Sequence, residues 1–175
     1  MSRRHWRIAV PVSALLVAVL TVLAVAALRP SEDVEPVKRP APDFALQKLD
    51  GSGPLRLADL RGHPAVLNFW ASWCAPCKAE FAVLRGAWPR YRQRGFVFVA
   101  IVFDDTTAAA GEFLRTAGAD WPVVVDEKSR AALSFGVRGI PQTYFLDGDG
   151  RIDHVERGPL TPSTLAARLS SLEHG

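Results

Sequence analysis

Two cysteines separated by two residues constrain this chain more than any other feature of its sequence, because of what lies on either side of them. Ala65–Trp70, an apolar run broken only by Asn68, precedes the pair and has the length of a buried strand. After Cys74 and Cys77 the chain continues with a helical pattern of apolar residues. A strand that leads through Cys-x-x-Cys into a helix places both sulfur atoms on one helical turn, close enough to form a disulfide.

This position gives the two sulfur atoms different chemistry. At the start of the helix, the sulfur of Cys74 faces free backbone N–H groups, and these groups together with the helix dipole favour its thiolate form. Cys77 lies one turn inside the helix, shielded, where it can attack a mixed disulfide on Cys74. We therefore predict a redox catalyst in which Cys74 is the nucleophile and Cys77 the resolving thiol.

A static structural disulfide and a metal-binding pair are the alternatives at this motif. Closing a loop of two residues constrains the unfolded chain very little. The chain has no other cysteine, and only His63 lies near the pair in sequence. Haem attachment requires a histidine after the second cysteine, where Lys78 stands. We expect no metal and no cofactor other than the Cys74–Cys77 disulfide itself.

The rest of the chain alternates strand and helix patterns, which predicts an α/β fold with parallel pairing at the centre and an antiparallel hairpin near the end. Strands are predicted at Ala65–Trp70, Phe96–Phe103, Val123–Val125, Thr143–Leu146 and Ile152–Arg157. Helices are predicted after Cys77, from Thr106 or Thr107 to Thr116, at Ser129–Phe135 and from Ser163 to Leu172. Pro89 is expected to kink or end the first helix, and Asp104-Asp105 to cap the second. His63 and His154 are expected at the surface.

The N-terminus is predicted to be a membrane anchor. Ile8–Leu28 is a run of 21 residues without a charge. As a helix it would span roughly 31 Å, which matches a hydrocarbon core of about 30 Å. Arg3, Arg4 and Arg7 precede the run and acidic residues follow it, so the positive-inside bias places the N-terminus in the cytoplasm. A signal peptide cleaved near residues 24–26 is the alternative.

Four segments are therefore predicted: a cytoplasmic N-terminus (1–7), a transmembrane signal-anchor (8–28), a proline-rich charged linker (29–41) and one domain (42–175) on the extracytoplasmic face of the cytoplasmic membrane. The first 29 residues hold four of the 21 basic residues and none of the 18 acidic ones, so the remainder carries one net negative charge. This balance provides no electrostatic footprint for nucleic acid, and we expect no such partner.

Two segments carry a resemblance to a known family. They are Asn68-Phe69-Trp70-Ala71-Ser72-Trp73-Cys74-Ala75-Pro76-Cys77-Lys78-Ala79-Glu80 and Gly136-Val137-Arg138-Gly139-Ile140-Pro141. Over nearly the whole of residues 42–175, the chain resembles the membrane-anchored extracytoplasmic thioredoxin-like proteins of the TlpA, ResA and CcmG type. Within that family it is similar to the reductases of cytochrome c maturation.

The resemblance implies a thioredoxin-like fold with an added N-terminal hairpin and a central insertion, here Asp104–Asp126. It also implies reduction of disulfides in secreted proteins, notably at the haem-binding Cys-x-x-Cys-His of apocytochrome c. The electrons would come from a membrane-embedded thiol donor of the CcdA or DsbD type.

The resemblance also points to a substrate-binding surface around the cysteines. A proline at the start of a late strand can simply mark the strand edge. In a Cys-x-x-Cys domain of this layout, however, Pro141 is expected to follow a cis peptide bond and to face the dithiol. The backbone at Ile140 would then pair with an extended substrate chain, and Trp73, Ala75 and Pro76 would form the rest of the surface.

Glu80 is a further candidate, three residues after Cys77 on the same helix face. A helical glutamate is ordinarily solvated, but the resemblance and the apolar neighbours Phe81 and Leu84 favour burial. Burial would raise the pKa of this carboxyl, which could then exchange protons with Cys77 as a general acid and base.

The leading interpretation is a protein disulfide reductase, and three alternatives remain. A disulfide-forming oxidase often stabilises the reduced thiolate through a polar residue between the cysteines, and Ala75-Pro76 supplies none. A peroxidase of the peroxiredoxin type would place a threonine ahead of a lone cysteine, where Trp73 stands. A membrane-tethered copper chaperone that uses Cys74 and Cys77 as ligands is the non-enzymatic alternative.

Overall fold

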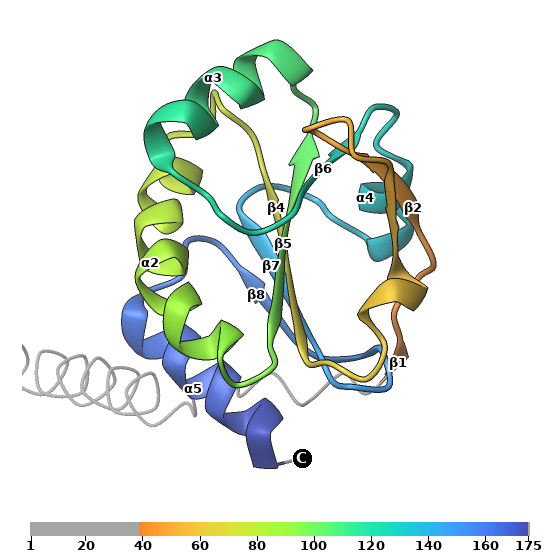
Figure 1. Ribbon diagram of the computed structural model, residues 1–175, viewed down its shortest axis with the longest axis vertical. Coiled ribbons are helices and arrows are strands. Elements are labelled where there is room, and N and C mark those ends of the chain that lie inside the picture. The colour runs from red at the N-terminus through yellow and green to blue at the C-terminus, as the bar shows by residue number, and fades with distance from the viewer. Residues whose placement is uncertain (1–38, 175) are drawn as a thin grey trace, which may run out of the picture. The chain divides into compact units, whose positions relative to one another are not determined.

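The computed structural model describes residues 39–174 of the 175-residue chain, and within that part eight strands form one sheet with helices on both faces (Figure 1). The strands are β1 (Arg39–Pro40), β2 (Ala45–Lys48), β3 (Pro54–Arg56), β4 (Ala65–Trp70), β5 (Val97–Phe103), β6 (Val123–Asp126), β7 (Gln142–Leu146) and β8 (Arg151–Arg157). The helices are the 3-10 helix η1 (Leu57–Leu60), α2 (Ala75–Arg92), α3 (Thr107–Ala117), α4 (Arg130–Phe135) and α5 (Pro162–His174). These bounds closely match the predicted strands and helices.

The sheet has parallel strands at its centre and antiparallel strands toward both edges. The strand order is β1-β8-β7-β4-β5-β6-β2-β3. Strand β5 pairs parallel with β4 and β6, while β7 pairs antiparallel with β4 and β8. The predicted α/β arrangement is therefore confirmed, and β2 and β3 form an N-terminal hairpin. Helix α3 and strand β6 lie in residues 104–126, the segment predicted to be a central insertion.

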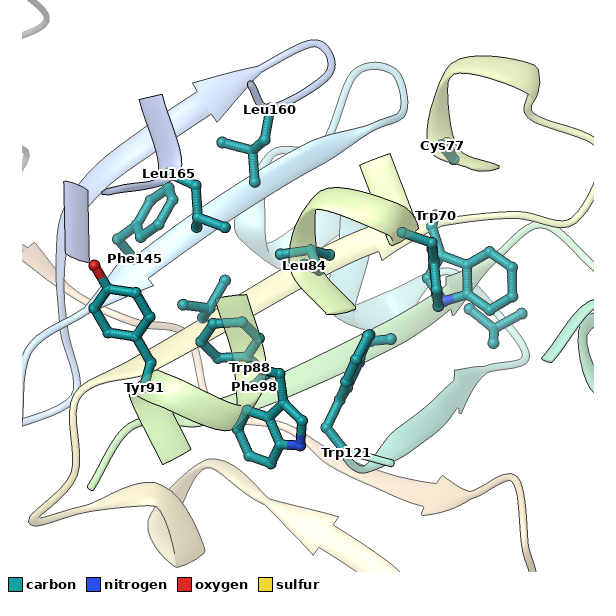
Figure 2. Close-up of a cluster of buried hydrophobic side chains, with 14 of the residues drawn as sticks. Trp70, Cys77, Leu84, Trp88, Tyr91, Phe98, Trp121, Phe145, Leu160 and Leu165 are labelled. Atoms are coloured by element: carbon teal, nitrogen blue, oxygen red, sulfur yellow. The ribbon is translucent and has the colours of Figure 1, made fainter. Parts of the chain in front are cut away.

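Two apolar cores lie on the two faces of the sheet. On the face covered by α2, α3 and α5, aromatic rings gather around Trp70, Trp88 and Trp121 (Figure 2). On the face covered by η1 and α4, the rings of Phe69 and Phe135 have centroids 5.6 Å apart. Because strand β4 is buried on both sides, its sequence is a nearly continuous apolar run rather than an alternating one.

Pro89 is expected from the sequence to kink or end helix α2, and the structure excludes the second alternative. The helix continues through Pro89 as far as Arg92. A proline inside a helix costs about 3 kcal/mol, but Trp88 and Tyr91 beside it are both buried in the core. Packing of these two aromatic side chains outweighs the local cost of the proline.

The folded domain begins slightly earlier than the predicted boundary at residue 42. Arg39 and Pro40, assigned by prediction to the linker, pair with β8 as an edge strand, a position that tolerates proline. The predicted cytoplasmic segment (1–7), the membrane anchor (8–28) and the first part of the linker lie outside the described residues. Between residues 39 and 174, no helix combines the length and the apolar character needed to cross a membrane.

Candidate active site

Cys74 and Cys77 form a disulfide at the N-terminus of helix α2. Their sulfur atoms are 1.98 Å apart and their Cα atoms 5.3 Å apart. Cys74 is the N-cap residue, and its Sγ accepts a hydrogen bond from the backbone N–H of Cys77 at 3.2 Å. Pro76 fits the first helical turn because the N–H that a proline lacks has no partner there. The predicted contact between the first sulfur and a free backbone N–H is thus confirmed.

The two cysteines differ in exposure in the predicted direction, but the difference is small. Cys74 is 4% exposed and Cys77 is 0% exposed, while Ala75 and Pro76 beside them are exposed. In the oxidised protein, a partner can therefore approach the disulfide only at Cys74. Among the described residues, no group of three or more histidine, cysteine, aspartate or glutamate side chains is arranged to hold a metal ion.

The active-site loop is held by the connection between β5 and α3. Trp73 is 59% exposed, and its indole N–H donates to the backbone carbonyl of Asp104 at 2.9 Å. The carboxylate of Asp105 accepts from the backbone N–H of Ser72 at 2.6 Å. Helix α3 is capped by the side chain of Thr106, one of the predicted caps, and not by the two aspartates that are also expected to cap it. Asp105 instead links the insertion to the active-site loop.

The peptide bond between Ile140 and Pro141 is cis, as predicted. In the β4–β7 ladder Phe69 pairs with Gln142, which places this bond at the end of the sheet where α2 begins. Pro141 is buried, whereas Ile140 is part-buried and packs against both cores. The cis proline and the Cys74–Cys77 loop therefore lie at the same end of the sheet.

Glu80 is buried, as predicted, with an exposed fraction of 1%. Its Oε1 accepts from the backbone N–H of Leu160 at 2.9 Å, and its Oε2 accepts from Nδ2 of Asn68 at 2.7 Å. Burial raises the pKa of Glu80 to about 7; the two hydrogen bonds oppose this rise and the charge of Glu156 adds to it. A carboxyl with a pKa near neutrality can both take up and release a proton at neutral pH.

The sequence prediction misses Asn68 and Leu160, the two hydrogen-bond partners of Glu80. Asn68 is buried and also donates to Oγ1 of Thr143 at 2.9 Å. It is the only polar residue in strand β4, and a polar residue inside a buried strand needs a partner, so this interruption could have identified it. Leu160 donates its backbone N–H to Glu80. Because every residue except proline has this group, the identity of the side chain could not have predicted the contact.

His154 is buried, which corrects the predicted surface position, whereas His63 is exposed as predicted. The imidazole of His154 packs beside the ring of Phe145 on the neighbouring strand β7, with ring centroids 6.4 Å apart. Nε2 of His154 lies 3.6 Å from Oε2 of Glu156. Burial lowers the pKa of His154, and the positive charge of Arg168 lowers it further.

Comparison with known proteins relates the chain to a family and to characterised relatives. The model of the AhpC/TSA family matches residues 37–155. Thiol-disulfide oxidoreductase ResA of Oceanobacillus iheyensis is 29% identical over 161 residues, which cover 90% of this chain and 84% of that protein.

Solved structures are similar over most of the domain. A thiol:disulfide interchange protein of the thioredoxin family from Chlorobium tepidum TLS is 27% identical with a TM-score of 0.70, over 80% of this chain and 98% of that one. A secreted Mycobacterium tuberculosis disulfide oxidoreductase homologous to E. coli DsbE is 25% identical with a TM-score of 0.64, over 74% and 96% of the two chains. These similarities confirm the predicted thioredoxin-like α/β fold.

Proposed function

The chain belongs to the AhpC/TSA family and is a thiol–disulfide oxidoreductase, and from this we propose that it reduces disulfides in proteins outside the cytoplasm. The observation that carries the proposal is the disulfide at the start of α2, with the Cys77 N–H directed at the Cys74 sulfur and the buried Glu80 one turn further on. The uncharged Ala75-Pro76 pair supports reduction rather than oxidation, because it adds no charge that would stabilise the reduced thiolate.

The proposed reaction is a two-step exchange. The thiolate of Cys74 in the reduced enzyme attacks one sulfur of a substrate disulfide; a mixed disulfide forms, the substrate S–S bond breaks, and one substrate cysteine leaves and takes a proton. Cys77 then loses its proton and attacks the sulfur of Cys74, which releases the second substrate cysteine. Two electrons pass from the enzyme to the substrate, and the enzyme is left with the Cys74–Cys77 disulfide.

Glu80 is proposed as the proton carrier for Cys77. It lies three residues further along the same helix, and both residues are shielded from solvent. Its pKa of about 7 allows the carboxylate to take the proton of Cys77 during resolution and to return one when the enzyme is reduced again. In the reduced site the carboxyl and the two thiols would titrate as one coupled group.

The substrate would bind across the exposed surface around the disulfide. Trp73, Ala75 and Pro76 would contact it on one side and the backbone preceding Pro141, at Ile140, on the other. The oxidised Cys-x-x-Cys-His segment of apocytochrome c is the proposed substrate, as the resemblance to the reductases of cytochrome c maturation implies. The proposed electron donor is a membrane-embedded thiol carrier of the CcdA or DsbD type.

We also propose that the protein is a single-pass protein of the cytoplasmic membrane, with residues 8–28 as its anchor and the catalytic domain on the extracytoplasmic face. The uncharged run and the arginines that precede it support this arrangement. A secreted disulfide oxidoreductase among the similar structures is consistent with work outside the cytoplasm.

Trapping of the mixed disulfide tests the proposed function. The Cys77→Ser variant, reduced and mixed with an oxidised Cys-x-x-Cys-His peptide, should accumulate a covalent complex through Cys74, because the resolving thiol is missing. The Cys74→Ser variant is the matched control and should trap none. Wild-type protein should convert the peptide to its dithiol form. An equilibrium that instead favours the oxidised peptide would identify an oxidase.

A further inference from the structure

A row of polar side chains crosses one face of the sheet beneath helices α2 and α5. Asn68 in β4 pairs in register with Thr143 in β7, and Thr143 pairs with Glu156 in β8. Nδ2 of Asn68 donates to Oγ1 of Thr143 at 2.9 Å. Around these residues this face of the sheet is occupied by the apolar core. We call Asn68, Thr143 and Glu156 the polar row.

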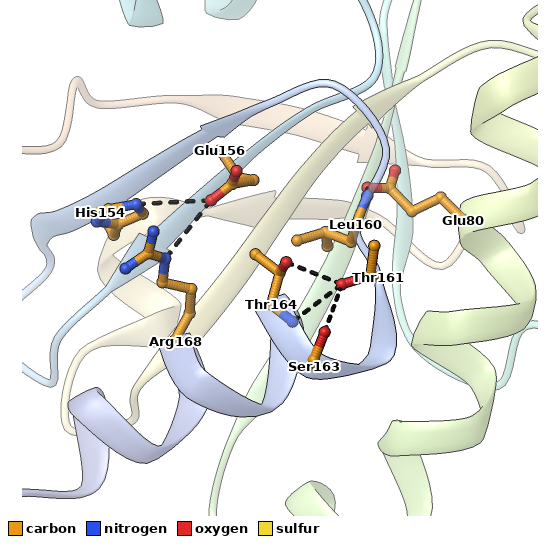
Figure 3. A network of polar contacts seen from close by, with 8 residues as sticks. All are labelled: Glu80, His154, Glu156, Leu160, Thr161, Ser163, Thr164 and Arg168. Atoms are coloured by element: carbon orange, nitrogen blue, oxygen red, sulfur yellow. Dashed lines mark hydrogen bonds and ion pairs between the residues drawn. The ribbon is translucent and has the colours of Figure 1, made fainter. Parts of the chain in front are cut away.

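The polar row lies between the active site and a charged cluster. At the first end, Nδ2 of Asn68 donates to Oε2 of Glu80 at 2.7 Å. At the second end, Oε2 of Glu156 lies 3.5 Å from Nε of Arg168 and 3.6 Å from Nε2 of His154. Figure 3 shows these two contacts converging on Glu156, with Glu80 on the adjacent helix α2.

We propose that Glu156 is a positioning residue that controls the proton affinity of Glu80, with Arg168 as its counter-ion. The proposal rests on the proposed role of Glu80 as proton carrier for Cys77 and adds a second carboxylate to that role. Glu156 acts through its charge and touches no reacting atom. The side chain of Glu156 is 26% exposed, so its charge is partly accessible to solvent while that of Glu80 is not.

The length of the polar row and the low dielectric constant of the protein interior allow the charge of Glu156 to influence the proton affinity of Glu80. Neighbouring strands lie about 4.8 Å apart, so the polar row spans roughly 10 Å from β4 to β8. Glu80 contacts the β4 end of this row through Asn68. At an effective dielectric constant of about 20, two unit charges separated by roughly the length of the row can shift a pKa by about one unit. Burial is the main cause of the raised pKa of Glu80, and the charge of Glu156 adds to this rise. The positive charge of Arg168, opposite in sign, should offset part of this effect.

Among the groups around Glu156, we expect the charges of Glu156 and Arg168 to have the main effect on the pKa of Glu80. His154 lies on the same strand, and burial together with the charge of Arg168 lowers its pKa, which favours the uncharged imidazole. Asp153, the remaining acidic residue of β8, lies where the pairing register between β7 and β8 shifts.

In the oxidised protein, the following groups on β4, β7 and α2 add no charge that would shift the pKa of Glu80. On β4 and β7 the facing side chains are Asn68 and Thr143, which carry no charge. On α2 the cysteines preceding Glu80 are joined in the Cys74–Cys77 disulfide and do not titrate. The titration of Glu80 can therefore be measured by itself in the oxidised protein.

The test is a titration of the Glu80 carboxyl by carbon-detected NMR in the oxidised full-length protein in detergent, with Glu80→Gln used to assign the resonance. In the wild-type protein the midpoint should lie at about 7. Glu156→Gln should lower the midpoint by up to about one pH unit, and Arg168→Gln should raise it by a similar amount. The pH profile of disulfide reduction should move in the same directions.

Two further variants distinguish a charge effect from a structural one. Glu156→Asp keeps the charge and should retain a midpoint close to that of the wild-type protein. Glu173 lies on α5, the same helix as Arg168, and its carboxylate pairs with Arg94 at 2.7 Å. Glu173→Gln removes this carboxylate and should leave the midpoint of the Glu80 titration unchanged. The shift in the reduction profile caused by Glu156→Gln should disappear in the Glu80→Gln background.

An unchanged midpoint in Glu156→Gln, or a shift of equal size in Glu173→Gln, would overturn the inference while leaving the proposed role of Glu80 intact. Movement of the Arg168→Gln midpoint in the same direction as that of Glu156→Gln would show that Arg168 is not the counter-ion. If Glu80→Gln itself leaves the pH profile of reduction unchanged, the proposed role of Glu80 fails, and this inference fails with it.

Discussion

The buried carboxyl of Glu80 makes the stability of this protein depend on pH. The pKa of Glu80 is raised from 4.5 to about 7, so the folded protein holds the proton more tightly than the unfolded chain does. Below pH 4.5 both states are protonated, and Glu80 imposes no penalty. As the pH rises toward 7 the unfolded chain ionises first, and the free energy of unfolding falls.

Glu80→Gln is expected to remove this pH dependence, because glutamine has no proton to lose. Between pH 4.5 and 7, the free energy of unfolding of the variant should rise relative to that of the wild-type protein by on the order of 3 kcal/mol. Urea denaturation of the oxidised proteins across this range measures the difference, with Glu173→Gln as the control. Parallel curves for the wild-type protein and Glu80→Gln would show that Glu80 does not titrate in this range.

The two cysteines are expected to react at different rates once the disulfide is reduced. Cys74 sits at the helix start, where the backbone N–H of Cys77 favours its thiolate, and it retains some exposure. Iodoacetamide should therefore modify Cys74 before Cys77 at every pH, as mass spectrometry of the peptides would reveal. Faster modification of Cys77 would reverse the assignment of nucleophile and resolving thiol.

At the scale of elements, the connection between β5 and α3 fixes the conformation of the active-site loop through hydrogen bonds. The Asp105 carboxylate accepts from the backbone N–H of Ser72 at 2.6 Å and from that of Thr106 at 2.7 Å. Asp104 contributes only its backbone carbonyl, to the indole of Trp73. The contact with Ser72 therefore depends on the side chain of Asp105 and not on that of Asp104. A hydrogen bond to a charged group contributes roughly 1.5–3 kcal/mol to the free energy of unfolding.

Asp105→Asn should therefore lower the free energy of unfolding by on the order of 1 kcal/mol, because an amide nitrogen cannot accept a hydrogen bond. It should also slow disulfide exchange several-fold by loosening the loop around Trp73. Asp104→Asn makes the same chemical change one residue earlier, and asparagine tolerates the positive φ of 49° at this position. Denaturant unfolding and insulin-reduction rates provide the comparison, and equal effects of the two substitutions would contradict this account.

At the scale of the whole molecule, the chain is expected to remain attached to the membrane by its uncharged N-terminal run. A phosphatase-type reporter fused after Gly175 should be active outside the cytoplasm, because the arginines before Ile8 favour the cytoplasmic side. Cell fractionation should recover the protein in the membrane with residues 1–28 retained. A soluble fragment that begins near residue 27 would instead identify a cleaved signal peptide.

The features that the sequence by itself determined are those encoded within a few residues. The apolar run before the cysteines, their two-residue spacing and the helical pattern after them predict the strand, the disulfide and the start of α2. The strand, the disulfide and the helix start depend on local geometry and on hydrophobic periodicity, which a sequence carries directly. The cis bond before Pro141 and the burial of Glu80 are expected only with the help of the family resemblance.

Only the tertiary structure decided which distant residues meet at the site. Glu80 accepts from the backbone of Leu160, 80 residues away, and Asn68 donates to Thr143, 75 residues away. The burial of His154 and the passage of α2 through Pro89 are also results of packing. Strand register and helix packing bring these groups together, and both are set by the burial of apolar surface over the whole domain, which outweighs local preferences.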